Sequence, residues 1–145
     1  MARAIGINHV ALEVGDVDEA LAWYARFVDF ELRGKRPTMA WIDLGDQFIA
    51  LSAGRRQGPD EGRHLGLVVD DKEAVRAALA DAGVAVAPRG GLRFDDPWGN
   101  SIEVVDYREV QFTKAAAVLD AMAPEGLEKT EAARAELARK GLAAG

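Results

Sequence analysis

The sequence contains no cysteine, and it has only two histidines among its 145 residues. Disulfide bonds, thiolate chemistry and zinc–cysteine sites are therefore excluded, and any metal would have to be held by histidine and carboxylate side chains. No apolar run approaches the ~18–20 residues that a membrane-spanning helix needs. The first ten residues, MARAIGINHV, contain no long apolar stretch, so we expect no signal peptide and a cytoplasmic location.

Positive charge is also scarce. The 18 Lys and Arg residues are outnumbered by 24 Asp and Glu residues, which gives a formal net charge of −6. Nucleic acids and anionic membrane surfaces attract clustered Lys and Arg, so the sequence predicts neither as a partner. Hydrophobic residues make up 49% and charged residues 29%, as in ordinary soluble globular domains.

Two stretches of the chain repeat one another. HVALEVGD begins at His9 and HLGLVVDD begins at His64, so the only two histidines lie at equivalent positions. Each stretch is followed by a segment with helical spacing of apolar residues, DVDEALAWYARFV and DKEAVRAALADAG. Asp16 is placed to cap the first of these helices, and Gly83 is placed to end the second.

Three short strand-like runs follow each predicted helix. They are FELRG, TMAWIDLG and QFIALSAG in the first half, and VAVAP, GLRFDD and NSIEVVDY in the second. The sequence therefore predicts two βαβββ modules, module one at residues 5–53 and module two at residues 62–107. Because about 50 residues bury little core alone, we expect the modules to pack as one domain over residues 1–107.

Residues 108–145 lie outside the repeat and predict two helices separated at Pro124 and Gly126. The second helix is rich in Ala, Glu, Arg and Lys, with Glu136 four residues before Lys140. We favour a solvated helical extension packed by its alanine face. The alternative is an arm of a dimer or a lid over a pocket.

The repeat also relates two positions on the last strand of each module. Ala50 lies 41 residues after His9, and Glu103 lies 39 residues after His64. Three of these four residues carry groups that bind metals. Because side chains alternate along a strand, the neighbours of Glu103 should face the helices and its carboxylate should point the other way.

A carboxylate on an inner strand needs a compensating partner, since an isolated buried charge is very costly. Two imidazoles and one carboxylate around a divalent cation would meet that need and leave two or three coordination positions open. This donor set suits Fe(II), Mn(II), Zn(II), Co(II) or Ni(II). We therefore predict a metal site of His9, His64 and Glu103, in which Glu103 could also act as a base. A histidine–glutamate hydrogen bond without metal is the alternative.

The sequence resembles the vicinal oxygen chelate superfamily, which includes glyoxalase I, extradiol dioxygenases, fosfomycin-modifying transferases, methylmalonyl-CoA epimerase and bleomycin-binding proteins. The resemblance rests on INHVALEVGDVDEALAWYARFVDFEL, RHLGLVVDD and DPWGNSIEVVDY and covers about residues 5–107, not the tail. It implies an α+β fold in which the two modules form an eight-stranded, cup-shaped sheet, here followed by a helical tail. It also implies a homodimer.

Residue by residue, the resemblance assigns His9, His64 and Glu103 to the metal-ligand positions of the superfamily. The fourth ligand of glyoxalase I, a Glu or Gln, would fall at Ala50. This departure argues against glyoxalase or epimerase chemistry and leaves the three-ligand pattern of extradiol dioxygenases and fosfomycin-type transferases. Where the family often carries an aromatic residue, this sequence has Arg93.

Arg93 lies between Leu92 and Phe94 and should face away from whatever they pack on. It is either a solvated arginine on an edge strand or a cation in the cup that binds a carboxylate or phosphate group of a substrate. Further candidates for substrate binding, which are as a class more often structural, are Trp41, Phe48, Ser52, Trp98 and Tyr107.

Two functions are consistent with these residues. The first is a metal-dependent enzyme whose ion chelates two adjacent oxygens of a small substrate, with dioxygenase, lyase, isomerase or transferase chemistry. The second is a metal-free protein that sequesters a drug in an aromatic cleft. The three tryptophans suit the second function, but it gives no role to the two histidines and the glutamate.

Overall fold

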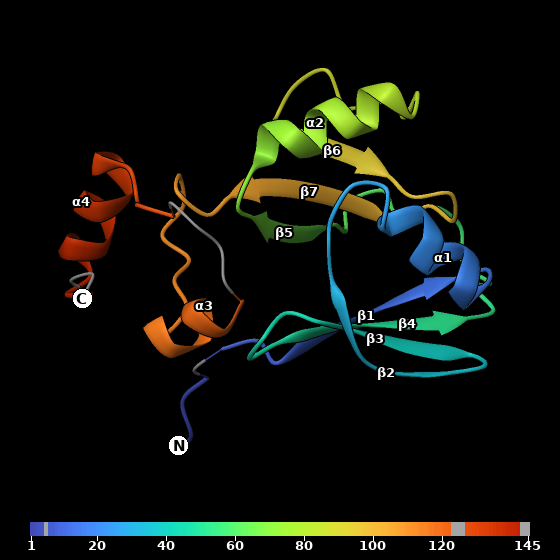
Figure 1. The fold of residues 1–145 in the computed structure, drawn as a ribbon, viewed down its shortest axis with the longest axis horizontal. Coiled ribbons are helices and arrows are strands. Elements are labelled where there is room, and N and C mark those ends of the chain that lie inside the picture. Colours follow the sequence, from blue (N-terminus) through green and yellow to red (C-terminus); the bar gives the residue numbers. More distant parts are fainter. Residues whose placement is uncertain (5, 123–126, 143–145) are drawn as a thin grey trace. The chain divides into compact units, whose positions relative to one another are not determined.

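The computed structural model describes residues 1–4, 6–122 and 127–142, in which the chain forms seven strands and four helices (Figure 1). The chain divides into two compact units. The N-terminal unit comprises Met1–Leu65 and Asp95–Ser101, and the C-terminal unit comprises Gly66–Phe94 and Ile102–Gly145. The predicted α+β class is confirmed. None of the helices in the described ranges is long and apolar enough to cross a membrane.

The N-terminal unit contains a four-stranded sheet in the order β1-β4-β3-β2. Its strands are β1 (His9–Val14), β2 (Glu31–Arg36), β3 (Met39–Asp43) and β4 (Phe48–Ala53). β1 runs parallel to β4, and the other neighbours are antiparallel. Along β1, Leu12 and Val14 are buried while His9 and Glu13 are exposed, as the alternation of side chains along a strand requires.

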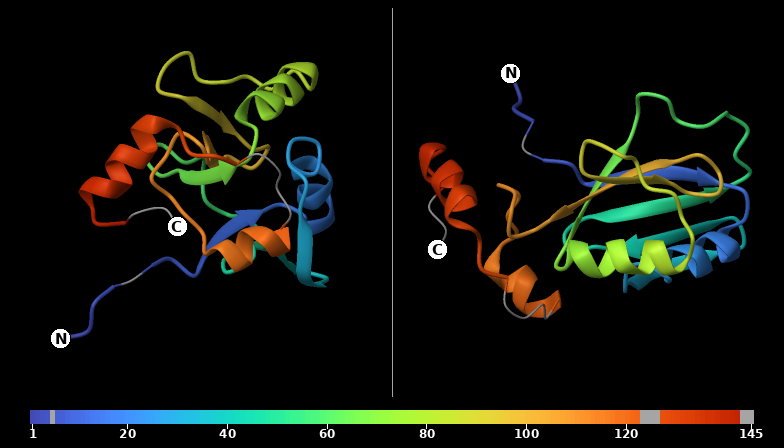
Figure 2. Two further views of the ribbon diagram at one scale, coloured as in Figure 1. Left: turned by 60° about the vertical axis from the view of Figure 1, so that its left-hand side comes forward. Right: turned by 90° about the horizontal axis from the view of Figure 1, so that it is seen from above.

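Helix α1 (Val17–Tyr24) lies along one face of this sheet, as the right-hand view of Figure 2 shows. The predicted cap is present, because the Asp16 carboxylate accepts a hydrogen bond from the Glu19 backbone N–H at 2.9 Å. Val17 and Tyr24 are buried, as their spacing predicts. The helix is shorter than the apolar pattern, since the chain turns after Tyr24 instead of continuing to residue 28.

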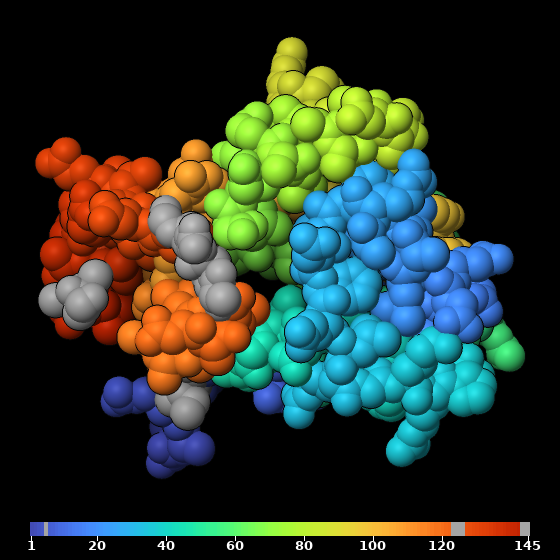
Figure 3. All heavy atoms as spheres, in the orientation of Figure 1, coloured from blue at the N-terminus to red at the C-terminus, as the bar shows by residue number. Residues whose placement is uncertain are grey.

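The C-terminal unit contains the three-stranded sheet β5-β7-β6 and helix α2 (Lys72–Asp81). Its strands are β5 (Leu65–Val69), β6 (Leu92–Asp95) and β7 (Ser101–Asp106). One terminal residue of each strand, Leu65, Asp95 or Ser101, is assigned to the N-terminal unit. The Asp71 carboxylate caps α2 by accepting a hydrogen bond from the Ala74 N–H at 2.9 Å, as the Asp16 carboxylate does for α1. Val75 and Leu79 form the buried face of α2. The opposite face of the helix is exposed to solvent in Figure 3.

The predicted strand VAVAP, residues 84–88, does not form, so the described chain has seven strands instead of eight. Gly83, at φ 69°, ends α2 in the left-handed conformation. The N–H of Val84 then bonds back to the Leu79 carbonyl at 2.9 Å, which ties the start of the segment to the helix instead of to a sheet. Pro88 has no N–H to offer a neighbouring strand.

The C-terminal segment forms helices α3 (Ala116–Met122) and α4 (Glu131–Arg139), and the predicted break at Pro124 and Gly126 lies outside the described residues. Ala133 and Leu137 form the buried face of α4. The predicted pair four residues apart is present, with Lys140 Nζ 2.9 Å from Glu136 Oε1.

A buried lysine holds this segment to the residues that follow β7. Lys129 is 8% exposed, and its Nζ donates hydrogen bonds to the carbonyls of Tyr107, Val110 and Phe112. The same ammonium lies 3.4 Å from the centre of the Tyr107 ring. Burial lowers the pKa of Lys129, and attraction to Asp106 partly opposes that change.

Asp106 at the end of β7 predicts a pH dependence of stability. Hydrogen bonds from Arg108, led by the guanidinium, lower the pKa of Asp106 to about 2. Because this value lies below the ordinary 3.8, the stabilisation is complete above about pH 4 and is lost as the pH falls towards 2. A change of about two pKa units corresponds to roughly 2 kcal/mol.

We therefore expect Asp106→Asn to lower the free energy of unfolding at pH 7 by up to roughly 2 kcal/mol and to weaken its decline between pH 4 and 2. Urea unfolding across this pH range measures both effects. Asp120→Asn on the exposed side of α3 is the control. Equal acid sensitivity of the wild type and Asp106→Asn would show that this carboxylate does not carry the effect.

Candidate functional site

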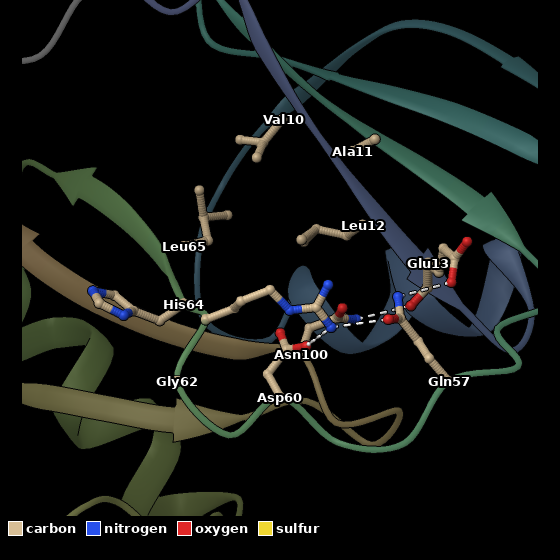
Figure 4. Close-up of a pocket in the computed structure, with 11 residues that line it drawn as sticks. Val10, Ala11, Leu12, Glu13, Gln57, Asp60, Gly62, His64, Leu65 and Asn100 are labelled. Carbon is tan, nitrogen blue, oxygen red and sulfur yellow. Dashed lines mark hydrogen bonds and ion pairs between the residues drawn. The ribbon is translucent and has the colours of Figure 1, made fainter.

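A pocket of about 620 Å³ lies in the N-terminal unit between β1 and the loop that leads to His64 (Figure 4). Val10, Leu12 and Leu65 give it an apolar side. Its polar side carries the charged residues Glu13, Asp60 and Arg63 and the amides Gln57 and Asn100. In Figure 4 the imidazole of His64 extends away from the cluster around Asp60 and Asn100.

His9, at the start of β1, is exposed but its ring is held in place. The imidazole stacks on Phe48, with ring centres 4.7 Å apart and planes 5° from parallel. Its Nδ1 lies 2.9 Å from Asn8 Oδ1. A neutral imidazole that donates its Nδ1–H to this amide oxygen carries its lone pair on Nε2, and that tautomer is suited to metal binding. Phe48, a predicted substrate-binding residue, thus supports His9.

Glu103 lies in the middle of β7 in the C-terminal unit. Its neighbours Ile102 and Val104 are buried, whereas its own side chain is 26% exposed, so it points to the predicted face. Glu103 Oε2 lies 3.3 Å from Nη2 of Arg93, which is on the adjacent edge strand β6. The structure therefore gives this carboxylate a positively charged partner from the chain itself.

Arg93 also has the predicted orientation, since its neighbours Leu92 and Phe94 are buried and its own side chain is 37% exposed. Its Nε is buried and has no hydrogen-bond partner within the part of the chain that the structure describes. An unmet buried donor is uncommon and usually costs free energy. One hydrogen-bonding position of the guanidinium is therefore left for another acceptor.

The described residues contain no group of three or more His, Asp or Glu side chains that could hold a metal ion. His9 and His64 belong to the N-terminal unit and Glu103 to the C-terminal unit, so the three-ligand site stays a prediction. The side chains themselves suit a divalent ion, because both imidazoles are exposed and the carboxylate is partly exposed. Ala50, at the fourth position, is buried and offers no donor atom.

The other predicted substrate-binding residues do not gather at the pocket. Trp41 and Ser52 are half-buried on β3 and β4, and Trp98 packs so closely on Gly15 that a Cβ there would lie 2.5 Å from its Nε1. Tyr107 is buried beneath Lys129 in the C-terminal unit. Their proposed contact with a substrate is not tested by this geometry.

Sequence reasoning missed a buried polar network beside the pocket, with Arg55 at its centre. The Arg55 side chain is only 4% exposed. Its guanidinium donates to Asn100 Oδ1, to the Gly58 carbonyl at 2.6 Å and to Asp60 Oδ1 at 3.4 Å. Asp60 also accepts from the Ser101 N–H at 3.4 Å. Burial alone would raise the pKa of Asp60, but these bonds and the nearby arginine charges lower it.

Asp96 extends the network to α1. Its carboxylate accepts hydrogen bonds from the Tyr24 hydroxyl at 2.8 Å and from the Asn100 side chain at 2.7 Å. Burial and the adjacent carboxylate raise the pKa of Tyr24. The DPWGN motif forms a turn here, in which Gly99 has φ 90° and its N–H donates to the Asp96 carbonyl at 3.0 Å. The acidic and amide residues of that motif were the available signal for the buried network.

Comparison with known proteins places these features in a family context. The family model described as Glyoxalase/Bleomycin resistance protein/Dioxygenase superfamily matches residues 6–104, so residues 108–145 lie outside it. No curated protein sequence matches the chain.

Three examples from different bacteria illustrate the similarity of the chain to solved structures. A protein assigned to the glyoxalase family from Bacillus anthracis is 24% identical, with a TM-score of 0.60 over 73% of this chain and 98% of that one. Lactoylglutathione lyase from Agrobacterium tumefaciens is 23% identical, with a TM-score of 0.57 over 72% and 95%. A mutant of the fosfomycin resistance protein FosX from Listeria monocytogenes, complexed with Mn(II) and 1S,2S-dihydroxypropylphosphonic acid, is 15% identical, with a TM-score of 0.61 over 70% and 90%. At these identities the similarity is one of fold.

The Arg55 network predicts a large difference between two arginines that contact the same carboxylate. Arg55→Met removes a buried guanidinium and leaves Asn100 Oδ1 and the Gly58 carbonyl without this donor, so we expect a loss of roughly 3 kcal/mol in the free energy of unfolding. Arg63→Met is the control, because the Arg63 side chain is 69% exposed and its loss should cost less than about 1 kcal/mol. Urea unfolding at neutral pH measures both values, and similar losses for the two variants would contradict the assigned role of Arg55.

Proposed function

Because the chain belongs to the glyoxalase/bleomycin resistance protein/dioxygenase superfamily, we propose that it is a metal-dependent enzyme acting on a small, oxygen-rich substrate. His9, His64 and Glu103 would hold the divalent ion, which would be Fe, Mn, Zn, Co or Ni. Such an ion supplies Lewis acidity to two adjacent substrate oxygens. The Mn(II) complex of FosX, a protein with a similar fold, supports an ion of this class.

The arrangement of His9 is the observation that carries this proposal. An exposed histidine without a function needs no fixed ring, yet this imidazole stacks on Phe48 and its Nδ1 lies within hydrogen-bond distance of Asn8 Oδ1. The same arrangement is what metal-binding histidines need, because a hydrogen bond at one nitrogen orients the other towards the ion.

Apart from the ion, the residues of the chain would contribute proton transfer and the number of positions open to substrate. Glu103 is the carboxylate that would accept a substrate proton when its bond to the ion loosens. With alanine at position 50, the ion would keep more open positions for substrate than a four-ligand site does. This supports dioxygenase-type or transferase-type chemistry over that of glyoxalase I.

We also propose that the enzyme acts as a homodimer. Membership of the superfamily, whose resemblance implies this assembly, supports the proposal. A site shared in the dimer would draw His9 and His64 from one copy and Glu103 from the other.

A metal-free binding protein is the second candidate, and one observation favours it. The Arg93 guanidinium already balances the charge of Glu103, so this carboxylate does not require an ion. Such a protein would hold an aromatic drug beside the exposed parts of its tryptophans and would release it unchanged.

Elemental analysis tests the metal site. We expect protein purified without chelator and supplied with Mn(II) or Zn(II) to hold about one ion per chain, and His64→Ala and Glu103→Gln to lose it. Glu13→Gln is the matched control, because Glu13 is an exposed carboxylate on β1 that is not among the proposed ligands. Circular dichroism confirms that each variant is folded.

An ion that persists in His64→Ala would remove that residue from the site. A wild-type protein that takes up no ion but binds an aromatic drug would establish the metal-free alternative.

A further inference from the structure

Arg93 and Glu103 form an ion pair that is looser than the two groups allow. The Nε and Nη2 hydrogens of an arginine point the same way and can bind both oxygens of one carboxylate. Here Nη2 lies 3.3 Å from Glu103 Oε2, and the buried Nε of Arg93 has no hydrogen-bond partner in the described parts of the chain. Of the two N–H groups on this edge of the guanidinium, the Nε–H therefore has no acceptor.

The backbone around the pair restricts how it can tighten. Gly91 has φ 99°, and a Cβ at this position would lie only 3.3 Å from Glu103 Oε1. Glycine thus lets the chain pass close to the carboxylate. Leu92 and Phe94 are buried on the opposite face and anchor the strand that carries Arg93. Movement of the pair is left mainly to the two partly exposed side chains.

We propose that Arg93 is an internal counter-ion of Glu103 that a divalent ion displaces, and that the displaced guanidinium then binds an oxyanion of the substrate. This inference rests on the proposed metal site at Glu103. It names the substrate class as a small molecule with a carboxylate or phosphonate group next to the oxygens that the ion chelates.

The displacement follows from charge. A divalent ion and a guanidinium compete for the same carboxylate, and two positive groups repel one another at short range. Once it is released, the guanidinium has both its Nε–H and its Nη2–H available on one edge, and one oxyanion can accept both hydrogen bonds. The ion and the anion both require the Arg93–Glu103 pair to be broken. Each should therefore strengthen the binding of the other, because whichever binds first has already broken the pair.

Binding of Mn(II) alone, measured from the electron paramagnetic resonance signal of the free ion, tests the first step. We expect Arg93→Met to bind Mn(II) about two- to tenfold more tightly than the wild type, since a partly exposed pair makes only a modest contribution. Arg76→Met is the matched control, because Arg76 forms an Arg–Glu pair of similar length, 3.1 Å, on the surface of α2. Glu103→Gln should abolish binding.

Two anion probes, acetate and methylphosphonate, test the second step at constant ionic strength against chloride. In the wild type we expect at least one of them to tighten Mn(II) binding, and the more effective one identifies the group that the site prefers. In Arg93→Met neither should have an effect. Thermal unfolding confirms that each variant is folded.

The outcomes separate this inference from the proposed function. Equal Mn(II) affinity in the wild type and Arg93→Met overturns the counter-ion role and leaves the metal site intact. An anion effect that persists in Arg93→Met, or that is absent from the wild type, overturns the oxyanion role. Binding by Arg93→Met but not by the wild type supports the inference. If neither protein binds Mn(II), or if Glu103→Gln still does, the metal site at Glu103 fails and the inference fails with it.

Discussion

A carboxylate on the central strand of a sheet needs a positive charge beside it, and the chemistry of this protein depends on how Glu103 meets that need. In the structure the charge comes from Arg93 on the neighbouring strand. In the proposed enzyme it comes from a metal ion. The two states differ by an exchange of cations at one carboxylate, so the pair links the fold of the C-terminal unit to the function of the protein.

Much of the scaffold could be predicted because its signals are local. The Asp16 cap and the alternating faces of β1 each depend on a few consecutive residues, and the structure contains both. The orientations of Glu103 and Arg93 followed from strand alternation in the same way. The strand expected at residues 84–88 failed for an equally local reason, since the glycine that ends α2 returns the chain to the helix before a strand can begin.

The candidate site was less predictable because its contacts join distant parts of the sequence. In the sequence, Arg55 is one of three arginines in the polar loop between β4 and β5, and only the fold shows that its guanidinium is buried against Asn100, 45 residues away. From the sequence, Lys129 would likewise be expected on the surface, yet its ammonium is buried and donates hydrogen bonds to three backbone carbonyls. Nor could the sequence show that Arg93 would contact Glu103, because register between strands is set by the whole sheet.

The placement of the aromatic residues has a practical consequence for studying this molecule. Trp41 and Trp98 both belong to the N-terminal unit, and so does the third tryptophan, Trp23, on α1. Intrinsic indole emission is therefore a signal from that unit alone. A melting curve followed by this emission, compared with one followed by backbone ellipticity, distinguishes concerted loss of both halves from sequential loss without any attached dye.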